Sequence, residues 1–208
     1  LTVSLAALGF AFSKLNEAAL RLQAADSFER QANRMGLASE KLLAELQKAS
    51  AGTVSTADLM ASANRAMALG VADSLSEFGA LMEIARDRAR VMGLTTTEAF
   101  DSIVTGIGRG SPMMLDNLGL VINLTEANAS YAEQVGIAAD ALSDEHKQRA
   151  LLNAVLKQGA ATLDETALST RTQAEELAKA RAELANTTDE LLRGLIPALT
   201  TALRAFNW

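Results

Sequence analysis

Side chains able to do chemistry are few in this sequence, and they lie far apart along it. Cysteine is absent, so disulfides, thiolate metal sites and cysteine nucleophiles are excluded. The single histidine, His146, stands among charged neighbours in SDEHKQRAL, where a helix is expected to begin. We interpret it as a solvated surface residue, with a general base or metal ligand as the alternative. Because no nucleophile, base and oxyanion site occur together, we expect no enzyme activity, catalytic residue, metal site or cofactor.

The glycine-rich stretch GIGRGSP superficially suggests a phosphate-binding loop. It contains Gly106, Gly108 and Gly110. However, it follows a helical pattern instead of a strand, and it lacks both the dinucleotide-binding and the Walker spacings. We interpret it as a mobile or tightly turned break between helices, with Arg109 exposed.

The densest basic cluster consists of Arg86, Arg88 and Arg90, which precede a helix end expected at Gly93. Cations near a helix C-terminus are stabilised by the helix dipole, and Asp87 interrupts the cluster. We interpret the cluster as capping electrostatics, and an anion-binding surface is the alternative.

The segment after Gly110 is expected to begin a short helix. Ser111 can cap it, and Pro112 can take the first helical position, where a missing N–H costs nothing. We interpret Met113 and Met114, beside Leu115, as core residues; a groove for partners is the alternative.

The elements that carry these residues are predicted to be helices throughout. Hydrophobic residues make up 49% of the 208 residues but aromatics only 4%, a balance that favours helices packed through small side chains over sheets. The formal net charge of −6, without a basic stripe, disfavours nucleic-acid binding. The most apolar stretch, residues 1–12, is too short to span a bilayer, so we expect a buried helix. The first residue, Leu1, suggests a fragment or a processed product.

Helix ends are marked by a glycine followed by an aliphatic residue, a pattern that commonly ends a helix in the left-handed conformation. The pairs are Gly36–Leu37, Gly70–Val71, Gly93–Leu94, Gly119–Leu120 and Gly136–Ile137. New starts are expected at the N-caps Ser39, Asp73, Thr95 with Glu98, Thr125 and Ser143. Together these signals predict consecutive helices joined by short turns.

Apolar residues at three- and four-residue steps support these helices, with one face formed by Leu15 to Phe28 and another by Leu75 to Ala85. The predicted fold is an all-α bundle or helical array with a long C-terminal helix. The expected ranges are 3–34, 40–50, 56–69, 73–91, 96–108, 112–118, 125–135, 143–158 and 165–206.

The last predicted helix carries a partial heptad pattern. Leu177, Leu184 and Leu191 recur at seven-residue intervals beside the charge ladder of Glu175, Lys179 and Glu183. Arg181 and Thr188 occupy intervening core positions and weaken the pattern. Self-association through this helix and packing onto the rest of the chain therefore both stay open. A kink is expected at Pro197, close to Gly194.

Three segments resemble phage tail tape-measure proteins. They are LQKASAGTVSTADLMASANRAMALG (46–70), TTTEAFDSIVTGIGRGSPMMLDNLGLVI (95–122) and TQAEELAKARAELANTTDELLRGLIPALTTAL (172–203). The resemblance lies in their order: a helix, a glycine-rich break, a short helix ending in a leucine-glycine-aliphatic turn, and an alanine-rich C-terminal helix.

This resemblance implies a structural role in a virion tail, where several copies fill the lumen, set its length and are released when DNA is ejected. The implied partners are tail tube and tail-tip proteins, tail assembly chaperones before assembly in the host cytoplasm, and other copies of the chain. Membrane spans and peptidoglycan-cleaving domains of some family members are not visible in this segment. The alternative is a helical adaptor or secreted-effector domain that recognises a partner along a groove.

A ruler works best as a rod, rising about 1.5 Å per helical residue, whereas glycine stops favour chain reversal. We therefore expect a compact helical module over residues 1–160 and a long helix over residues 161–208, leading into a rod or coiled coil.

Overall fold

The computed structural model describes residues 5–164 and 168–206, and every regular element within those ranges is helical. This confirms the predicted all-α fold with a long C-terminal helix. The elements are α1 (Leu5–Arg34), α2 (Ser39–Ala49), α3 (Thr56–Ala68), α4 (Leu75–Met92), α5 (Thr96–Gly108), α6 (Pro112–Asp116), α7 (Leu124–Val135), the 3-10 turn η1 (Ala139–Ala141), α8 (Asp144–Thr162) and α10 (Gln173–Phe206).

Helix α10 shows the largest difference between predicted and observed boundaries. Its expected start at residue 165 lies outside the described residues, and the helix begins at Gln173. A reciprocal cap sets this start: Thr172 Oγ1 accepts a hydrogen bond from the Glu175 N–H at 3.2 Å, and the Glu175 carboxylate accepts one from the Thr172 N–H at 2.9 Å. The helix then continues through Pro197.

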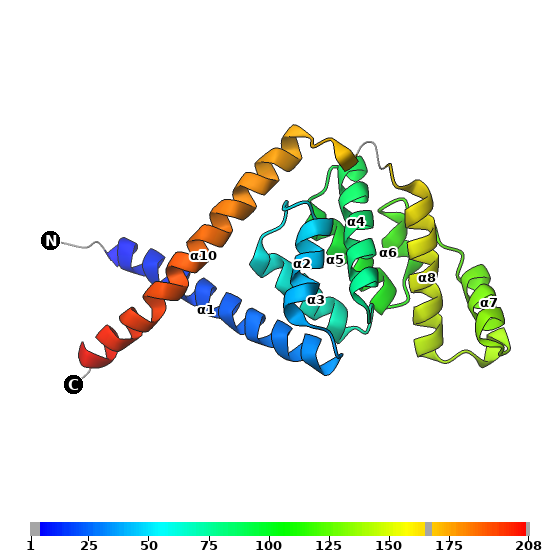
Figure 1. The fold of residues 1–208 in the computed structure, drawn as a ribbon, viewed down its shortest axis with the longest axis horizontal. Coiled ribbons are helices and arrows are strands. Elements are labelled where there is room, and N and C mark those ends of the chain that lie inside the picture. Colours follow the sequence, from blue (N-terminus) through cyan, green and yellow to red (C-terminus); the bar gives the residue numbers. More distant parts are fainter. Residues whose placement is uncertain (1–4, 165–167, 207–208) are drawn as a thin grey trace.

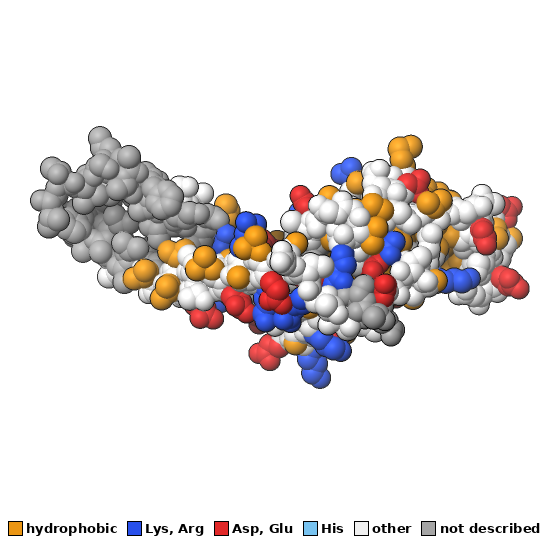
Figure 2. Space-filling view, turned by 90° about the horizontal axis from the view of Figure 1, so that it is seen from above, with side chains coloured by type: hydrophobic (Ala, Val, Ile, Leu, Met, Phe, Trp, Pro, Cys, Tyr) orange, Lys and Arg blue, Asp and Glu red, His pale blue; other side chains and the backbone are white. Residues whose placement is uncertain are grey.

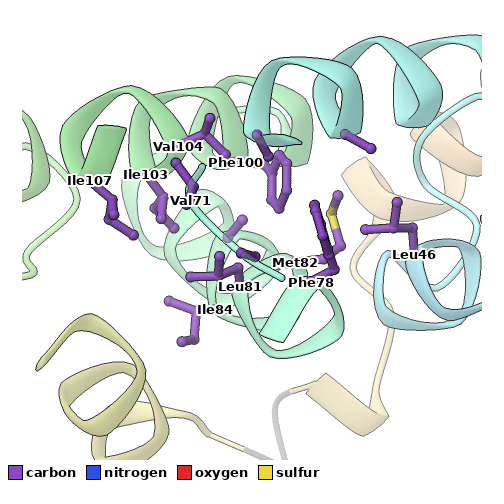
Figure 3. Close-up of a cluster of buried hydrophobic side chains, with 14 of the residues drawn as sticks. Leu46, Val71, Phe78, Leu81, Met82, Ile84, Phe100, Ile103, Val104 and Ile107 are labelled. Atoms are coloured by element: carbon purple, nitrogen blue, oxygen red, sulfur yellow. The ribbon is translucent and has the colours of Figure 1, made fainter. Parts of the chain in front are cut away.

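The hydrophobic core surrounds α4, which packs against α2, α5 and α8 (Figure 1). Phe78, Leu81 and Met82 of α4 are buried together with Phe100 and Ile103 of α5, as Figure 3 shows. The apolar face predicted for residues 75–85 is therefore the one that the core buries. Removing such side chains from water is the main stabilising contribution to a fold of this kind.

Helix α8 approaches α4 closely at a glycine. A Cβ added to Gly159 would lie 2.6 Å from Ile84 Cγ1, so only a residue without a side chain fits between the two helices. The neighbouring Leu152 and Val155 of α8 are fully buried. Helix α7 in turn packs against α8 and buries only Ala132, so it lies at the edge of the molecule (Figure 1).

All five predicted glycine-aliphatic pairs end their helices as expected. Each glycine has a positive φ, between 62° and 73°. In each pair the N–H of the aliphatic residue donates to the carbonyl five residues earlier, at 2.9–3.1 Å, which satisfies a carbonyl that the helix leaves free. Leu37, Val71 and Leu120 pack on the core, whereas Leu94 and Ile137 are exposed.

The predicted N-caps are partly correct. Thr95 with Glu98 forms a full capping box, and Ser143 accepts from the His146 N–H at 3.2 Å. The other three were wrong. Helix α4 is capped by Ser74 in place of Asp73, because the Ser74 side chain accepts from the Glu77 N–H at 3.3 Å. Helix α7 is capped by Asn123 in place of Thr125, and Ser39 is the first residue of α2, after Ala38.

Helices α2–α8 are referred to below as the body, and helices α1 and α10 form two arms that cross and extend from it (Figure 1). The C-terminal part of α1 packs on α3 and contributes Phe28 and Ala32 to the core. The far ends of both arms, at Leu5 and Phe206, lie on the same side of the molecule. The predicted division into residues 1–160 and 161–208 stays a prediction.

Candidate functional site

The histidine and the methionines lie in surroundings different from those expected. His146 is half-buried, not solvated, and its ring centroid lies 5.9 Å from that of Tyr131. Its Nδ1 atom is buried and has no hydrogen-bond partner among the described residues. Met113 is 76% exposed and Met114 is only half-buried, so the interpretation of both as core residues was wrong. The residue of this short helix that is buried in the core is Leu115.

The glycine-rich stretch is a packed helix end. Gly106 and Gly108 belong to α5, and a Cβ on either would lie within 2.9 Å of Leu115 or Leu69 side-chain atoms. Only Gly110, with φ of +61°, makes the tight turn, and Arg109 is exposed as expected. The first two glycines therefore allow α5 to approach its neighbours closely.

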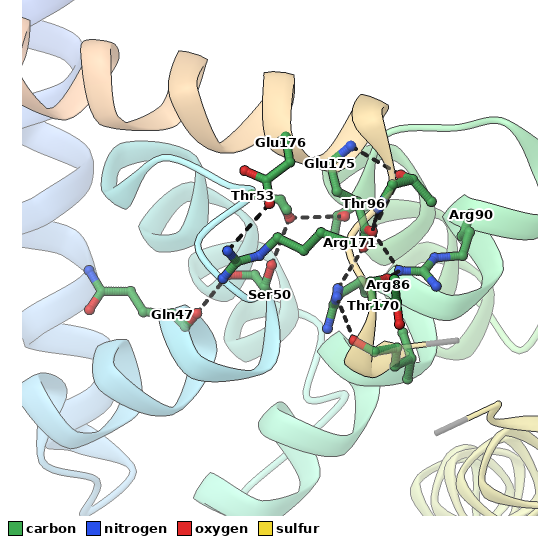
Figure 4. Close-up of polar contacts among 12 residues, drawn as sticks. Gln47, Ser50, Thr53, Arg86, Arg90, Thr96, Thr170, Arg171, Glu175 and Glu176 are labelled. Carbon is green, nitrogen blue, oxygen red and sulfur yellow. Dashed lines mark hydrogen bonds and ion pairs between the residues drawn. The ribbon is translucent and has the colours of Figure 1, made fainter. Parts of the chain in front are cut away.

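The arginine cluster, Arg86, Arg88 and Arg90, forms the attachment point of α10. Arg86 Nε donates to Glu175 at 2.8 Å, and Arg90 Nη2 donates to the other oxygen of the same carboxylate at 2.5 Å (Figure 4). The same two arginines also donate to the carbonyls of Leu168 and Thr170. Neither sequence interpretation, capping electrostatics or an anion-binding surface, anticipated this contact with the segment that precedes α10.

Arg88 completes the cluster on the α8 side. It pairs with the buried carboxylate of Asp87 and donates to the carbonyl of Thr162 at 3.2 Å. The three arginines thus bind three carbonyls and one carboxylate between the end of α8 and the first turn of α10.

Electrostatics at the attachment point favour a charged carboxylate. Burial raises the pKa of Glu175, but hydrogen bonds from the Thr172 N–H and from Arg86 and Arg90 outweigh it, and the pKa lies below its ordinary value. The sequence marks Glu175 only through the motif Thr172-x-x-Glu175, which is typical of a capping box. No sequence pattern connects Glu175 with arginines more than eighty residues away.

The rest of α10 contacts α1 and the body mainly through polar side chains. Asn186 Oδ1 accepts from the Thr56 N–H at 2.9 Å, and Asp189 pairs with Arg21 at 2.6 Å. Ala182 is the one buried hydrophobic residue among the described side chains of α10. The face of α10 that meets the rest of the chain therefore carries these polar contacts together with small residues, the half-buried Ala178 and Ala185.

The opposite face of α10 is apolar and exposed, and its first leucine, Leu177, also borders a groove towards α3 and α5. We call its four leucines the leucine stripe; Leu177, Leu184, Leu191 and Leu195 are 53%, 68%, 65% and 53% exposed. Figure 2 shows hydrophobic side chains spaced along this arm. A helix that docks by polar contacts and turns leucines to solvent inverts the usual arrangement of a surface helix.

Two grooves accompany the outlying helices. One of about 800 Å³ lies between α10 and the starts of α3 and α5, and Leu94, Thr95, Leu177 and Arg181 are among its lining residues. The other, of about 610 Å³, lies between α7 and α8 and is lined by Tyr131 and Ala154, among others.

Within residues 5–164 and 168–206, no three His, Cys, Asp or Glu side chains are grouped as a metal site would require. In the same residues, no helix has both the length and the apolarity needed to cross a bilayer. No protein-family model matches the chain, and no significant match was found among solved structures.

Proposed function

We propose that this chain is a folded structural module of a phage or phage-like tail tape-measure protein, acting in assembly within the virion tail. The proposal is supported by the resemblance of residues 46–70, 95–122 and 172–203, in which helices, glycine-rich break and short helix follow one another. Its partners would be tail tube and tail-tip proteins and tail assembly chaperones.

The observation that supports a module over a stretch of ruler is the course of the two arms. Helices α1 and α10 join the body at different edges, but their far ends lie on the same side of it (Figure 1). A stretch of ruler would carry the chain from one end to the other. We therefore infer that the segment folds beside a rod and contributes little to its length.

The test is an in-frame deletion of the coding region for residues 1–208 in a phage that encodes them, with tail length measured by electron microscopy. We expect a shortening far below about 300 Å, which is the helical rise of 208 residues, together with defective assembly or infection. The control deletes an equal length of uninterrupted helical sequence in the same protein. Tails shorter by about 300 Å in the test deletion would contradict the module.

The second candidate is a helical adaptor that binds a partner along a groove. It is favoured by the 610 Å³ groove between α7 and α8, into whose lining Gln158 brings a buried amide oxygen with no hydrogen-bond partner among the described residues. Ala154→Trp should fill this groove. The adaptor is the better explanation if a partner binds the unchanged chain but not this variant, and if a phage that carries the variant has tails of normal length.

A further inference from the structure

We infer that the leucine stripe of α10 binds α10 of a second copy of this chain, as a parallel two-stranded coiled coil. The inference follows from the exposed face of α10 and does not depend on the assignment to a phage tail. Solution mass tests it, whereas tail length tests the proposed function, so the two can fail separately.

The heptad register agrees with the way α10 already docks. Three leucines of the stripe, Leu177, Leu184 and Leu191, occupy position a of the heptad, and Leu195 falls at e, beside the seam. The side chains that contact the rest of the chain fall at c and f, on the far side from the seam. These are Glu175, Lys179, Ala182, Asn186 and Asp189, of which Lys179 lies beside Gly52. Docking and pairing therefore use different faces of one helix, and both can occur together.

Position d in this register holds Ala180, Thr187 and Gly194, which are all exposed. A Cβ added to Gly194 would have no heavy atom within 4 Å. Small residues at d let two backbones approach closely, so that leucines at a can cover them. In this register Arg181 and Thr188 fall at e, beside the seam, and not at the core positions that the sequence interpretation gave them. The second-copy interface therefore depends on the three leucines.

Charges beside the seam select a second copy in parallel orientation. Position g holds Glu176, Glu183 and Glu190, and position e holds Arg181, which makes no ion pair with a described residue. In a parallel pair, Glu176 of one helix lies opposite Arg181 of the other, twice by symmetry. In an antiparallel pair the glutamates would face one another and repel.

The preformed helix compensates for the short seam. Residues 174–195 provide only about three heptads, and isolated helices of such length are marginal in water. Here the N-terminal part of α10 is already held by Glu175, Asn186 and Asp189, so association need not order it anew. The leucines then supply the apolar surface that pairing removes from water.

The first experiment is sedimentation equilibrium of the full chain from about 1 µM to about 1 mM, a range that detects weak association. We expect the mass to rise from 21.9 kDa towards twice that value. Leu184→Asp should weaken association about tenfold or more, since it places a charge in the middle of the seam. The matched control is Val121→Asp, because Val121 is 69% exposed and lies away from α10. A chain that stays monomeric throughout, or an equal effect of the control, would overturn the inference.

Orientation is tested by cross-linking, which the absence of native cysteine makes clean. In a parallel pair, Ala180→Cys alone and Gly194→Cys alone should each form a disulfide with its own counterpart. In an antiparallel pair, position d of one helix lies opposite position a of the other, so neither variant would meet its own counterpart. An associating chain that forms neither disulfide would refute the parallel arrangement. Charge reversal gives an independent check: Glu176→Arg and Arg181→Glu should each weaken association, and the double variant should restore it.

Discussion

At the scale of single residues, Glu175 is the side chain on which most contacts of the α10 attachment converge. Its carboxylate is 12% exposed, caps its own helix and receives hydrogen bonds from Arg86 and Arg90. Removing its charge would leave the guanidinium groups of Arg86, which is buried, and of Arg90, which is half-buried, without this counter-charge. Such a loss is costly where solvent screening is weak.

We predict that Glu175→Gln lowers the free energy of unfolding by about 2 kcal/mol at pH 7. The folded-state pKa of Glu175 lies below its ordinary value of 4.5, so its stabilisation is fully present above that pH. It is lost as the pH falls through the lowered folded-state pKa. Urea unfolding at pH 7 and pH 3 should therefore show a difference from the unchanged chain that shrinks in acid.

The control for this prediction is Glu83→Gln, which changes an exposed carboxylate on α4, the helix that carries the arginine cluster. We expect no measurable change in unfolding at either pH, since exposed charges contribute little. An equal loss in both variants would show that Glu175 has no special part in holding α10.

Close packing at Gly159 gives a second prediction at this scale. Gly159→Ala should destabilise the chain by about 1–3 kcal/mol, because the methyl group would overlap the side chain of Ile84. Gly194→Ala, in the open part of α10, should stabilise it by about 0.5–1 kcal/mol, because alanine loses less freedom in a helix. Thermal unfolding of both variants at one protein concentration shows whether each substitution raises or lowers the stability. A Gly159→Ala variant more stable than the unchanged chain would contradict the close packing.

At the scale of elements, the glycine-aliphatic pairs decide where five of the helices end: α1, α3, α4, α6 and α7. Their effect is local: a left-handed residue reverses the chain, and the next N–H satisfies a carbonyl of the last turn. For this reason the ends were predictable from sequence, and so were the full capping box at Thr95 and the first helical position of Pro112.

Gly36, between α1 and α2, allows the cost of the left-handed backbone conformation to be measured apart from side-chain packing, because a Cβ there would have no heavy atom within 4 Å. Gly36→Ala should cost about 1–2 kcal/mol, since its φ of +73° disfavours a side chain. Gly36→Asn should cost less than half as much, because asparagine tolerates this conformation. Equal losses from chemical denaturation of the two variants would show that φ is not the cause.

At the scale of the whole molecule, the arms give the chain a shape that a compact domain lacks. A globular domain of 208 residues has a radius of gyration of about 17 Å. We predict a larger value from small-angle X-ray scattering, with a distance distribution that has a globular maximum and a long tail. The Leu184→Asp variant should be used to prevent pairing. A profile of a uniform rod, or of a sphere without a tail, would contradict this arrangement of arms and body.

The sequence by itself determined the helical class, the helix ends and the apolar face of α4, because hydrophobic spacing and capping act within a few residues. It also located the leucines of α10, but it left open whether they pack on the chain or face outwards. Only the tertiary structure decided that, by placing Arg86 and Arg90 beside Glu175 and so turning the polar face of α10 inwards.

The same limit explains the misplaced candidates. Burial of His146 depends on Tyr131 from another helix, and exposure of Met113 depends on which side of α6 faces the core. Gly106 and Gly108 were interpreted as part of a mobile or tightly turned break, because their close neighbours, Leu115 and Leu69, lie outside α5 and leave no local pattern in the sequence. Contacts between distant segments have no local pattern, so the attachment of α10, and with it the exposed leucine stripe, could be found only in the folded chain.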